Sequence, residues 1–372
     1  MADVQKILFV AGTRPEIIKI SPLIKSMRES REFHPFLLFT SQHTDLGMDF
    51  LSEFALIPDI VLDPIRDPTL RLARVHNQVV GGTSQACLDL KPDVVLVQGD
   101  TISAAAGANA AFLSQVAVGH IEAGLRTFDL YNPFPEEWAR RVVAQSSTWH
   151  FAPTEGARRN LLAEGHPETS IFVTGNTGID SVRLLTESSR RPETHSTSMT
   201  YTNKPRRTVL ITLHRRELES STDQLDLFLE RAFARFADID FVAVHHPNGL
   251  LSSSLSRLRE PPNLQVFPPQ TYRNFITLMN NSDAVISDSG GVQEEATYLN
   301  VPLLVLREST ERAETLERPN SRQCPISLRA LDELERLLSL PPQEGLSYRH
   351  SFGDGHATER ILSILEDQRR CA

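Results

Sequence analysis

Residues 7–27 read ILFVAGTRPEIIKISPLIKSM. The first four are apolar, which is typical of a buried strand, and Pro15 stands where a first helical turn would begin, ahead of apolar residues at helical spacing. Gly12 therefore lies in a turn that joins a buried strand to a helix N-terminus. Such termini attract anions through their N–H groups and dipole. Because Arg14 and Lys19 add two cations nearby, we expect this turn to bind a phosphate group.

A similar alternation of apolar runs with amphipathic stretches extends over the rest of the chain. Strand-like runs include VVLV and AVGHI in the first half and TVLIT, FVAV and AVIS in the second. The alternation predicts a parallel sheet with helices on both faces in each half. We therefore expect an α/β protein with two doubly wound, Rossmann-like domains that face a cleft, residues 1–186 and 206–355. The polar, Ser/Thr-rich residues 187–205 indicate a linker or surface loop, and we expect a C-terminal helix at 356–372 to pack on the first domain.

Composition and charge limit the classes of function. At 372 residues the chain is long for one hydrophobic core, and a net charge of -9 argues against a nucleic-acid-binding surface. Cys87, Cys324 and Cys371 have no metal or redox spacing, which favours reduced thiols in a cytoplasmic protein. No signal peptide is evident at the N-terminus, and no apolar run approaches the roughly 20 residues that a bilayer requires. We expect neither a nucleic-acid nor a membrane partner.

Chemically unusual residues directly follow the apolar runs. Since ligands of open α/β sheets bind at the carboxyl ends of the strands, we expect these residues to converge on one cleft. They are Arg14, Gln42 with His43, Asp100 with Thr101, Glu122, His214 with Arg215 and Arg216, and Ser289 to Gly291.

The stretch DSGGVQEEA, residues 288–296, is a glycine turn that enters a helix. Backbone N–H groups of Ser289, Gly290 and Gly291 could cradle a diphosphate, and Glu295 could accept hydrogen bonds from ribose hydroxyls. The alternative is a plain strand-to-helix turn in which acidic residues favour the helix N-terminus. We expect Glu294 to lie on the surface.

Asp100, Glu122 and Glu136 form an acidic set. Carboxylates gathered in one cleft raise one another's pKa, which makes an acid and a base available near neutral pH. Asp100 could instead cap a helix, and Glu136 could simply open one. His214 stands beside two arginines, which suits a group that binds or protonates a phosphate leaving group.

The chain resembles the non-hydrolysing UDP-N-acetylglucosamine 2-epimerases over nearly its full length. The stretches that carry the resemblance are, in order, GTRPEIIK, SQH, VQGDT, GHIEAGLRT, NPFPEEWAR, FAPTE, VTGNTGID, LHRRE, DSGGVQEEA and GDGHATERI. That family is similar in fold to the GT-B glycosyltransferases and interconverts UDP-GlcNAc and UDP-ManNAc at C2. It uses no metal or nicotinamide and usually forms homodimers, so the resemblance implies no cofactor and a homodimer here.

The resemblance also implies a mechanism and a set of site residues. UDP departs from C1 while a carboxylate removes the C2 proton, and UDP adds back to the bound 2-acetamidoglucal after protonation on the other face. Asp100, Glu122, Glu136 and His214 match the catalytic positions, with the identity of the C2 base left open among the carboxylates. The candidate substrate-binding residues are Arg14, Lys19, Gln42, His43, Arg140, Gln270, Phe275, Ser289, Gly290, Gly291, Glu295 and Arg312.

Departures from the family pattern leave other functions open. Residues 44–46 and 245–248 differ near the region where bacterial members bind a second UDP-GlcNAc, so allosteric activation is not implied. The alternatives are epimerisation of a related sugar such as a UDP-2,3-diacetamido uronic acid, a hydrolysing epimerase, a GT-B glycosyltransferase, and a non-catalytic UDP-sugar binder.

Overall fold

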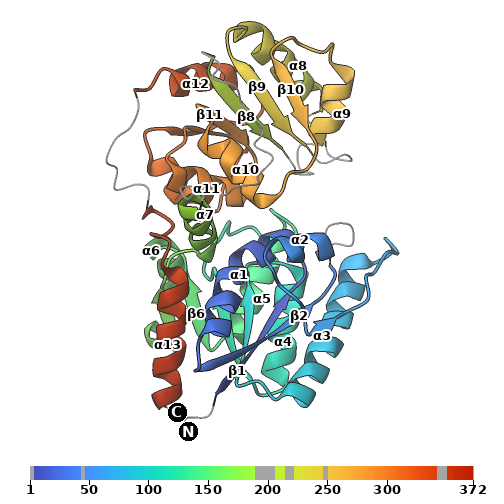
Figure 1. Ribbon diagram of the computed structural model, residues 1–372, viewed down its shortest axis with the longest axis vertical. Coiled ribbons are helices and arrows are strands. Elements are labelled where there is room, and N and C mark those ends of the chain that lie inside the picture. The colour runs from blue at the N-terminus through green and yellow to red at the C-terminus, as the bar shows by residue number, and fades with distance from the viewer. Residues whose placement is uncertain are drawn as a thin grey trace. The chain divides into compact units, whose positions relative to one another are not determined.

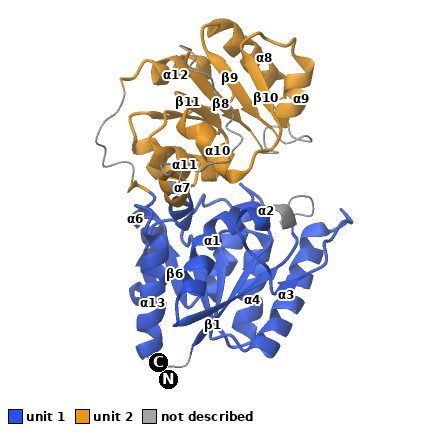
Figure 2. Cartoon of the chain, in the orientation of Figure 1, with its two compact units in different colours: residues 1–181, 352–372 blue, residues 182–351 orange. Residues whose placement is uncertain are grey.

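The computed structural model describes residues 4–42, 47–188, 206–213, 222–245, 250–341 and 350–371. The chain divides into two compact units (Figure 2). Unit 1 comprises residues 1–181 and 352–372, and unit 2 comprises residues 182–351. Most of the predicted linker, like the predicted site residues His43 and His214, lies outside the described residues. In the part of the chain that is described, no helix has the length and apolar character needed to cross a membrane.

Unit 1 is built on a parallel sheet of seven strands in the order β3-β2-β1-β4-β5-β6-β7. Strands β1, β2 and β6 of this sheet are labelled in Figure 1. The strand order reverses between β1 and β4, which pair directly, so the switch point of this sheet lies at their carboxyl ends. The strands are β1 (Gln5–Ala11), β2 (Phe33–Phe39), β3 (Ile60–Val61), β4 (Val94–Gln98), β5 (Ala117–Ile121), β6 (Trp149–Ala152) and β7 (Ile171–Val173). The helices are α1 (Arg14–Glu29), α2 (Gly47–Glu53), α3 (Arg71–Leu90), α4 (Ile102–Leu113), α5 (Glu136–Ser146), α6 (Glu155–Ala163), α7 (Thr177–Ser188), which continues into unit 2, and α13 (Ala357–Cys371).

Unit 2 repeats the architecture with six parallel strands in the order β10-β9-β8-β11-β12-β13. Its order reverses between β8 and β11, so its switch point lies where β11 leads into the glycine turn. The strands are β8 (Thr208–Thr212), β9 (Asp240–Val244), β10 (Leu264–Phe267), β11 (Ala284–Ser287), β12 (Leu303–Val305) and β13 (Ser321–Gln323). The helices are α8 (Thr222–Arg235), α9 (Leu250–Arg257), α10 (Tyr272–Asn280), α11 (Gly290–Leu299) and α12 (Arg329–Leu338).

Both units follow from the patterns in the sequence. The central strands are buried on both faces, with Leu8, Phe9 and Leu96 at 0% exposure, as expected for parallel strands covered by helices. The predicted α/β class with two Rossmann-like halves is confirmed.

The chain leaves unit 1 through α7 and returns to it at Phe352. The backbone N–H of Asn176 donates to the carbonyl of Phe352 at 2.7 Å. The carboxylate of Asp180, in α7, accepts from the N–H groups of Ala357 (3.2 Å) and Thr358 (2.7 Å) at the start of α13. The last helix of the chain is therefore part of the first unit.

Candidate active site

The turn between β1 and α1 is held by hydrogen bonds to a side chain in the first turn of α1. A Cβ added to Gly12 would lie 1.7 Å from Oγ1 of Thr40, so only glycine fits here. The Glu16 carboxylate accepts from the N–H groups of Gly12 (2.9 Å) and Thr13 (2.8 Å) and from the hydroxyl of Thr101 (2.7 Å). The chain's own carboxylate thus takes the N–H groups of Gly12 and Thr13, and phosphate binding at this turn stays a prediction. A glutamate in the first turn of a helix reaches back to its N-terminus, which explains these hydrogen bonds.

Glu122 and Lys19 form a buried ion pair. Glu122 follows β5 with a left-handed backbone, at a φ of 69°, and its Oε2 accepts from Lys19 Nζ, Gln98 Nε2 (3.1 Å) and Asn176 Nδ2 (2.8 Å). Only 6% of each of Glu122 and Lys19 is exposed. The structure therefore places Lys19, which we assigned to a diphosphate, beside a predicted catalytic carboxylate.

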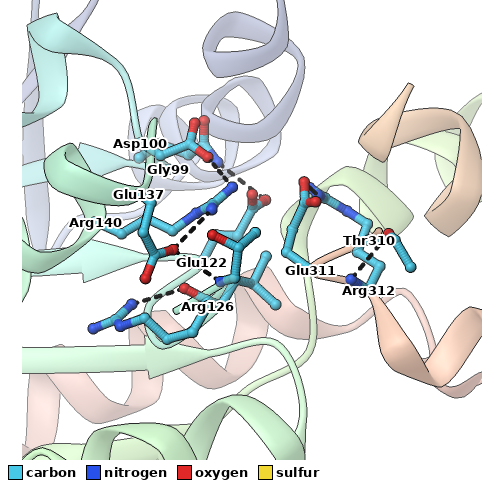
Figure 3. A network of polar contacts seen from close by, with 12 residues as sticks. Gly99, Asp100, Glu122, Arg126, Glu137, Arg140, Thr310, Glu311 and Arg312 are labelled. Atoms are coloured by element: carbon cyan, nitrogen blue, oxygen red, sulfur yellow. Dashed lines mark hydrogen bonds and ion pairs between the residues drawn. The ribbon is translucent and has the colours of Figure 1, made fainter. Parts of the chain in front are cut away.

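Arg140 donates hydrogen bonds to both Asp100 and Glu137, the second residue of α5 (Figure 3). Its guanidinium donates to Oδ2 of Asp100 at 2.5 Å and to Oε2 of Glu137 at 3.3 Å. Glu137 is fully buried and also accepts from the N–H groups of Thr127 (2.9 Å) and Phe128 (3.3 Å). Glu137 was not predicted as a site residue. The arginines three and four residues after it were the available signal, because such spacing places charges on one helix face.

Three other predicted residues occupy distinct positions in unit 1. Glu136 is the first residue of α5 and is half-buried. Gln42 accepts from the N–H (3.0 Å) and the hydroxyl (2.7 Å) of Ser103 at the start of α4. The guanidinium of Arg14 lies over the ring of Phe50, 4.7 Å from its centroid.

His120 is a buried residue that sequence reasoning did not single out. Its Nε2 lies 2.8 Å from the carbonyl oxygen of Gly99, so this nitrogen carries the proton and donates. Burial lowers the pKa of His120 to about 4, and the imidazole is neutral at neutral pH. The hydrogen bond fixes the turn that presents Asp100.

In unit 2, the start of α11 packs against an arginine. A Cβ on Gly290 would lie 2.4 Å from Nη1 of Arg312, so glycine is required for the guanidinium to lie there. Arg312 Nε donates to Glu294 at 2.6 Å, and its Nη1 pairs with Glu311 (Figure 3). Glu311 also pairs with Arg307 at 3.0 Å. Glu294 is 2% exposed, so the expectation that it lies on the surface is wrong: its partner comes from the loop after β12, which local sequence does not indicate.

The other predicted residues of unit 2 lie on two helices and the turns before them. Ser289 precedes the first residue of α11, followed by Gly290 and Gly291. Glu295 is buried and accepts from the hydroxyl of Tyr272 at 2.9 Å. Gln270 precedes α10 and donates to the carbonyl of Pro268, and Phe275 of α10 packs partly buried against the unit 2 core.

The structure thus brings the predicted residues together in two sets, each within its own unit. Unit 1 joins Lys19 to Glu122 and Arg140 to Asp100 at the carboxyl edge of its sheet. Unit 2 gathers Ser289, Gly290, Glu295 and Arg312 around the first turns of α11. Among the described residues, no group of three or more His, Cys, Asp or Glu is placed to hold a metal ion.

Comparisons with known proteins first define the class. The glycotransferase of kitacinnamycin superposes with a TM-score of 0.64 at 15% identity, covering 98% of this chain and 99% of that one. Two Rossmann-like units, each built on a parallel sheet, define a GT-B-like α/β protein.

The family follows from closer relatives. Residues 25–366 match the family described as UDP-N-acetylglucosamine 2-epimerase. The UDP-N-acetylglucosamine 2-epimerase of Salmonella typhimurium is 37% identical over 374 residues, covering 98% of this chain and 99% of the relative. The UDP-GlcNAc 2-epimerase from Neisseria meningitidis, solved bound to UDP-GlcNAc, superposes with a TM-score of 0.89 at 33% identity, covering 98% of this chain and 100% of that one. The chain belongs to the UDP-N-acetylglucosamine 2-epimerase family, as the resemblance in its motifs implied.

Proposed function

We propose that this chain is a non-hydrolysing isomerase that interconverts UDP-GlcNAc and UDP-ManNAc by inversion at C2. The observation that carries the proposal is the unbroken acidic set, Asp100, Glu122 and Glu136, in a chain that aligns with a 37% identical epimerase over 98% of its length. Two of these carboxylates are held in fixed orientation by buried cations, Lys19 and Arg140, as general acid–base chemistry requires.

The reaction begins with departure of UDP. The C1–O bond breaks and its electron pair leaves with the diphosphate, while the C2–H electrons form the C1=C2 bond of 2-acetamidoglucal. A carboxylate of the acidic set accepts the C2 proton. The second half runs in reverse: a proton is added to the opposite face of C2, and a diphosphate oxygen of UDP attacks C1.

The residue types suit the charges that develop. The C2 proton is weakly acidic, so departure of the leaving group must be well advanced before the proton is lost. Negative charge that grows on the diphosphate is stabilised by the N-terminus of α11, whose first residues are Gly290 and Gly291, and by cationic groups that include His214 when protonated. Carboxylates stabilise the oxocarbenium character at C1.

The test is a proton NMR time course of the purified protein with UDP-GlcNAc in deuterated water. We expect UDP-ManNAc to appear with deuterium at C2. Asp100→Asn should lower the rate by about 100-fold or more, since general acid–base groups contribute on that order. The matched control is Asp93→Asn, at the opposite end of β4, where Asp93 accepts from the N–H of Lys6 at 2.7 Å.

Each alternative gives a different outcome. Free ManNAc would identify a hydrolysing enzyme, and an unchanged spectrum would overturn the assignment to UDP-GlcNAc in favour of a related UDP-sugar. Binding of UDP with no exchange at C2 for any such sugar would leave a GT-B glycosyltransferase or a binding role, and only the glycosyltransferase would consume the UDP-sugar when an acceptor is added.

We also propose that the chain acts as a homodimer in the cytoplasm. The family resemblance supports the dimer, and a nucleotide-sugar substrate supports the compartment. Light scattering on a sizing column tests the first point: a mass of one chain at micromolar concentration contradicts it.

A further inference from the structure

Two of the stretches that carry the family resemblance contain none of the predicted site residues. They are VTGNTGID (173–180) and GDGHATERI (353–361). The structure places them against each other in unit 1. A Cβ on Gly175 would lie 3.0 Å from Cα of Gly353, and both glycines have left-handed backbones, with φ of 87° and 116°. The two chain segments therefore meet backbone to backbone, at a contact that larger residues would force apart.

Hydrogen bonds of three residues, Asn176, Asp180 and Arg360, hold this junction. Asn176 N–H donates to the Phe352 carbonyl at 2.7 Å, and Asp180 accepts from the first N–H groups of α13. Arg360 donates to the carbonyl of Thr174 at 3.1 Å and pairs with Asp354 through both ends of its guanidinium, at 2.8 and 2.7 Å. That pairing holds the pKa of Asp354 well below its usual range. The returning chain thus fixes the backbone on both sides of Asn176.

The side chain of Asn176 points from this junction to Glu122. Its Oδ1 accepts from the N–H of Gly178 at 3.1 Å, so its amide NH₂ is the group that faces the carboxylate. That NH₂ donates to Oε2 of Glu122 at 2.8 Å, and Asn176 is 1% exposed. Lys19 supplies charge to the same oxygen, whereas the amide supplies a donor with a fixed direction.

We propose that Asn176 is a positioning residue for Glu122, and that the junction of the two stretches fixes the position of the Asn176 backbone. The inference rests on the proposed function, in which Glu122 is one of the carboxylates that handle the C2 proton. A carboxylate that must meet one face of C2 needs a set orientation, and misplacement by about 1 Å costs on the order of 100-fold in rate. Asn176 acts only through Glu122.

The test compares the variants Asn176→Asp and Asn176→Ala with a variant in which a buried asparagine of unit 2 is replaced. Asn176→Asp keeps the size and the acceptor for Gly178 but removes the donor and adds a second carboxylate. The control is Asn263→Ala, since the Asn263 amide donates to the carbonyls of Phe233, Phe236 and Ile239 at 3.2, 3.1 and 3.0 Å. We expect both Asn176 variants to lower kcat by about 100-fold with KM within about threefold, and Asn263→Ala to lower the melting temperature with kcat retained.

A double-mutant cycle separates positioning from a general structural role. Glu122→Gln and Glu122→Gln/Asn176→Ala should have the same kcat, because both lack the carboxylate that Asn176 orients for proton transfer. A further loss in the double variant overturns the inference, as does wild-type kcat in either single Asn176 variant. Asn176→Asp should also move the acid limb of the kcat–pH profile to higher pH, since two adjacent carboxylates resist joint ionisation. If the wild-type protein does not epimerise UDP-GlcNAc, the proposed function itself fails, which this series distinguishes from failure at Asn176 alone.

Discussion

The Glu16 carboxylate is buried at the switch point of the unit 1 sheet and joins two turns. It accepts from the β1–α1 turn at Gly12 and Thr13 and from Thr101, the residue after Asp100. Burial raises its pKa from 4.5 to about 7, although each of these hydrogen bonds opposes the shift. A residue in this environment links stability to pH near neutrality.

Replacement of Glu16 by glutamine should change how stability depends on pH. Between pH 4.5 and about 7 the folded chain keeps a proton on Glu16 that the unfolded chain has released, so wild-type stability falls as pH rises through this window. The loss amounts to roughly 3 kcal/mol at about 1.4 kcal/mol per pH unit. Glu16→Gln cannot ionise, so its melting temperature relative to wild type should rise between pH 4.5 and pH 8, as followed by circular dichroism.

The control for this change is Glu29→Gln, on the exposed face of the same helix. It removes the same charge without the burial and reports the effect of net charge alone. A relative melting temperature for Glu16→Gln that is the same at both pH values would contradict a buried, titrating Glu16.

At the residue scale, sequence reasoning predicted the positions of Asp100 and Glu122 in the fold better than it predicted which residues pair with one another. Asp100 and Glu122 were predicted because they follow apolar runs, and the structure puts both at the carboxyl edge of the sheet. The Lys19–Glu122 pair joins residues 103 positions apart, and Glu294 pairs with Arg312 from a separate loop. Such pairings depend on tertiary packing, which a single local pattern does not encode.

At the scale of elements, α11 shows how a loop sets the start of a helix. The helix was predicted from its glycine turn, but the reason for the first glycine lies outside that turn. Arg312 occupies the space beside Gly290, where its guanidinium is held by Glu294 and Glu311, all of them buried. A Cβ at residue 290 would displace the guanidinium of Arg312 from this position. Because loss of one partner of a buried ionic network leaves another charge without compensation, the network depends on this glycine.

The two neighbouring glycines make a matched pair of variants. Gly290→Ala should destabilise unit 2 by about 1–3 kcal/mol, because the added Cβ overpacks a pinned guanidinium. In Gly291→Ala the nearest contact of the new Cβ is Glu295 Oε1 at 3.9 Å, an ordinary separation. That variant should be neutral or more stable by up to about 1 kcal/mol, since alanine favours helix over glycine. Urea unfolding measures both, and equal midpoints for the two variants would show that Arg312 yields without cost.

At the scale of the whole molecule, unit 1 is discontinuous in sequence. The alternation of strands and helices predicted the α/β class because it is a local, periodic signal. The contact between Asp180 and Ala357 spans 177 positions. Periodicity indicates a helix at residues 357–371, and we expected it to pack on the first domain, but periodicity does not say which residues the helix contacts. Phe352, Ile361 and Leu365 are buried to 1% exposure or less, so the returning segment contributes core to unit 1.

A chain that ends at residue 351 should therefore lose unit 1 and keep unit 2. Each buried side chain of that size contributes about 1.5–3 kcal/mol, and a domain has only about 5–15 kcal/mol of stability in total. Hydrogen exchange read by mass spectrometry resolves the two units: amides of β1 and β4 should lose protection, while those of β8 and β11 should retain it. Arg369→Ala, which removes only an ion pair with Glu32 at 3.6 Å on the surface, should leave both sheets protected. Equal loss of protection in both sheets would mean that unit 2 cannot fold without unit 1. The two units would then be compact parts of one cooperative structure and would not be independently stable domains.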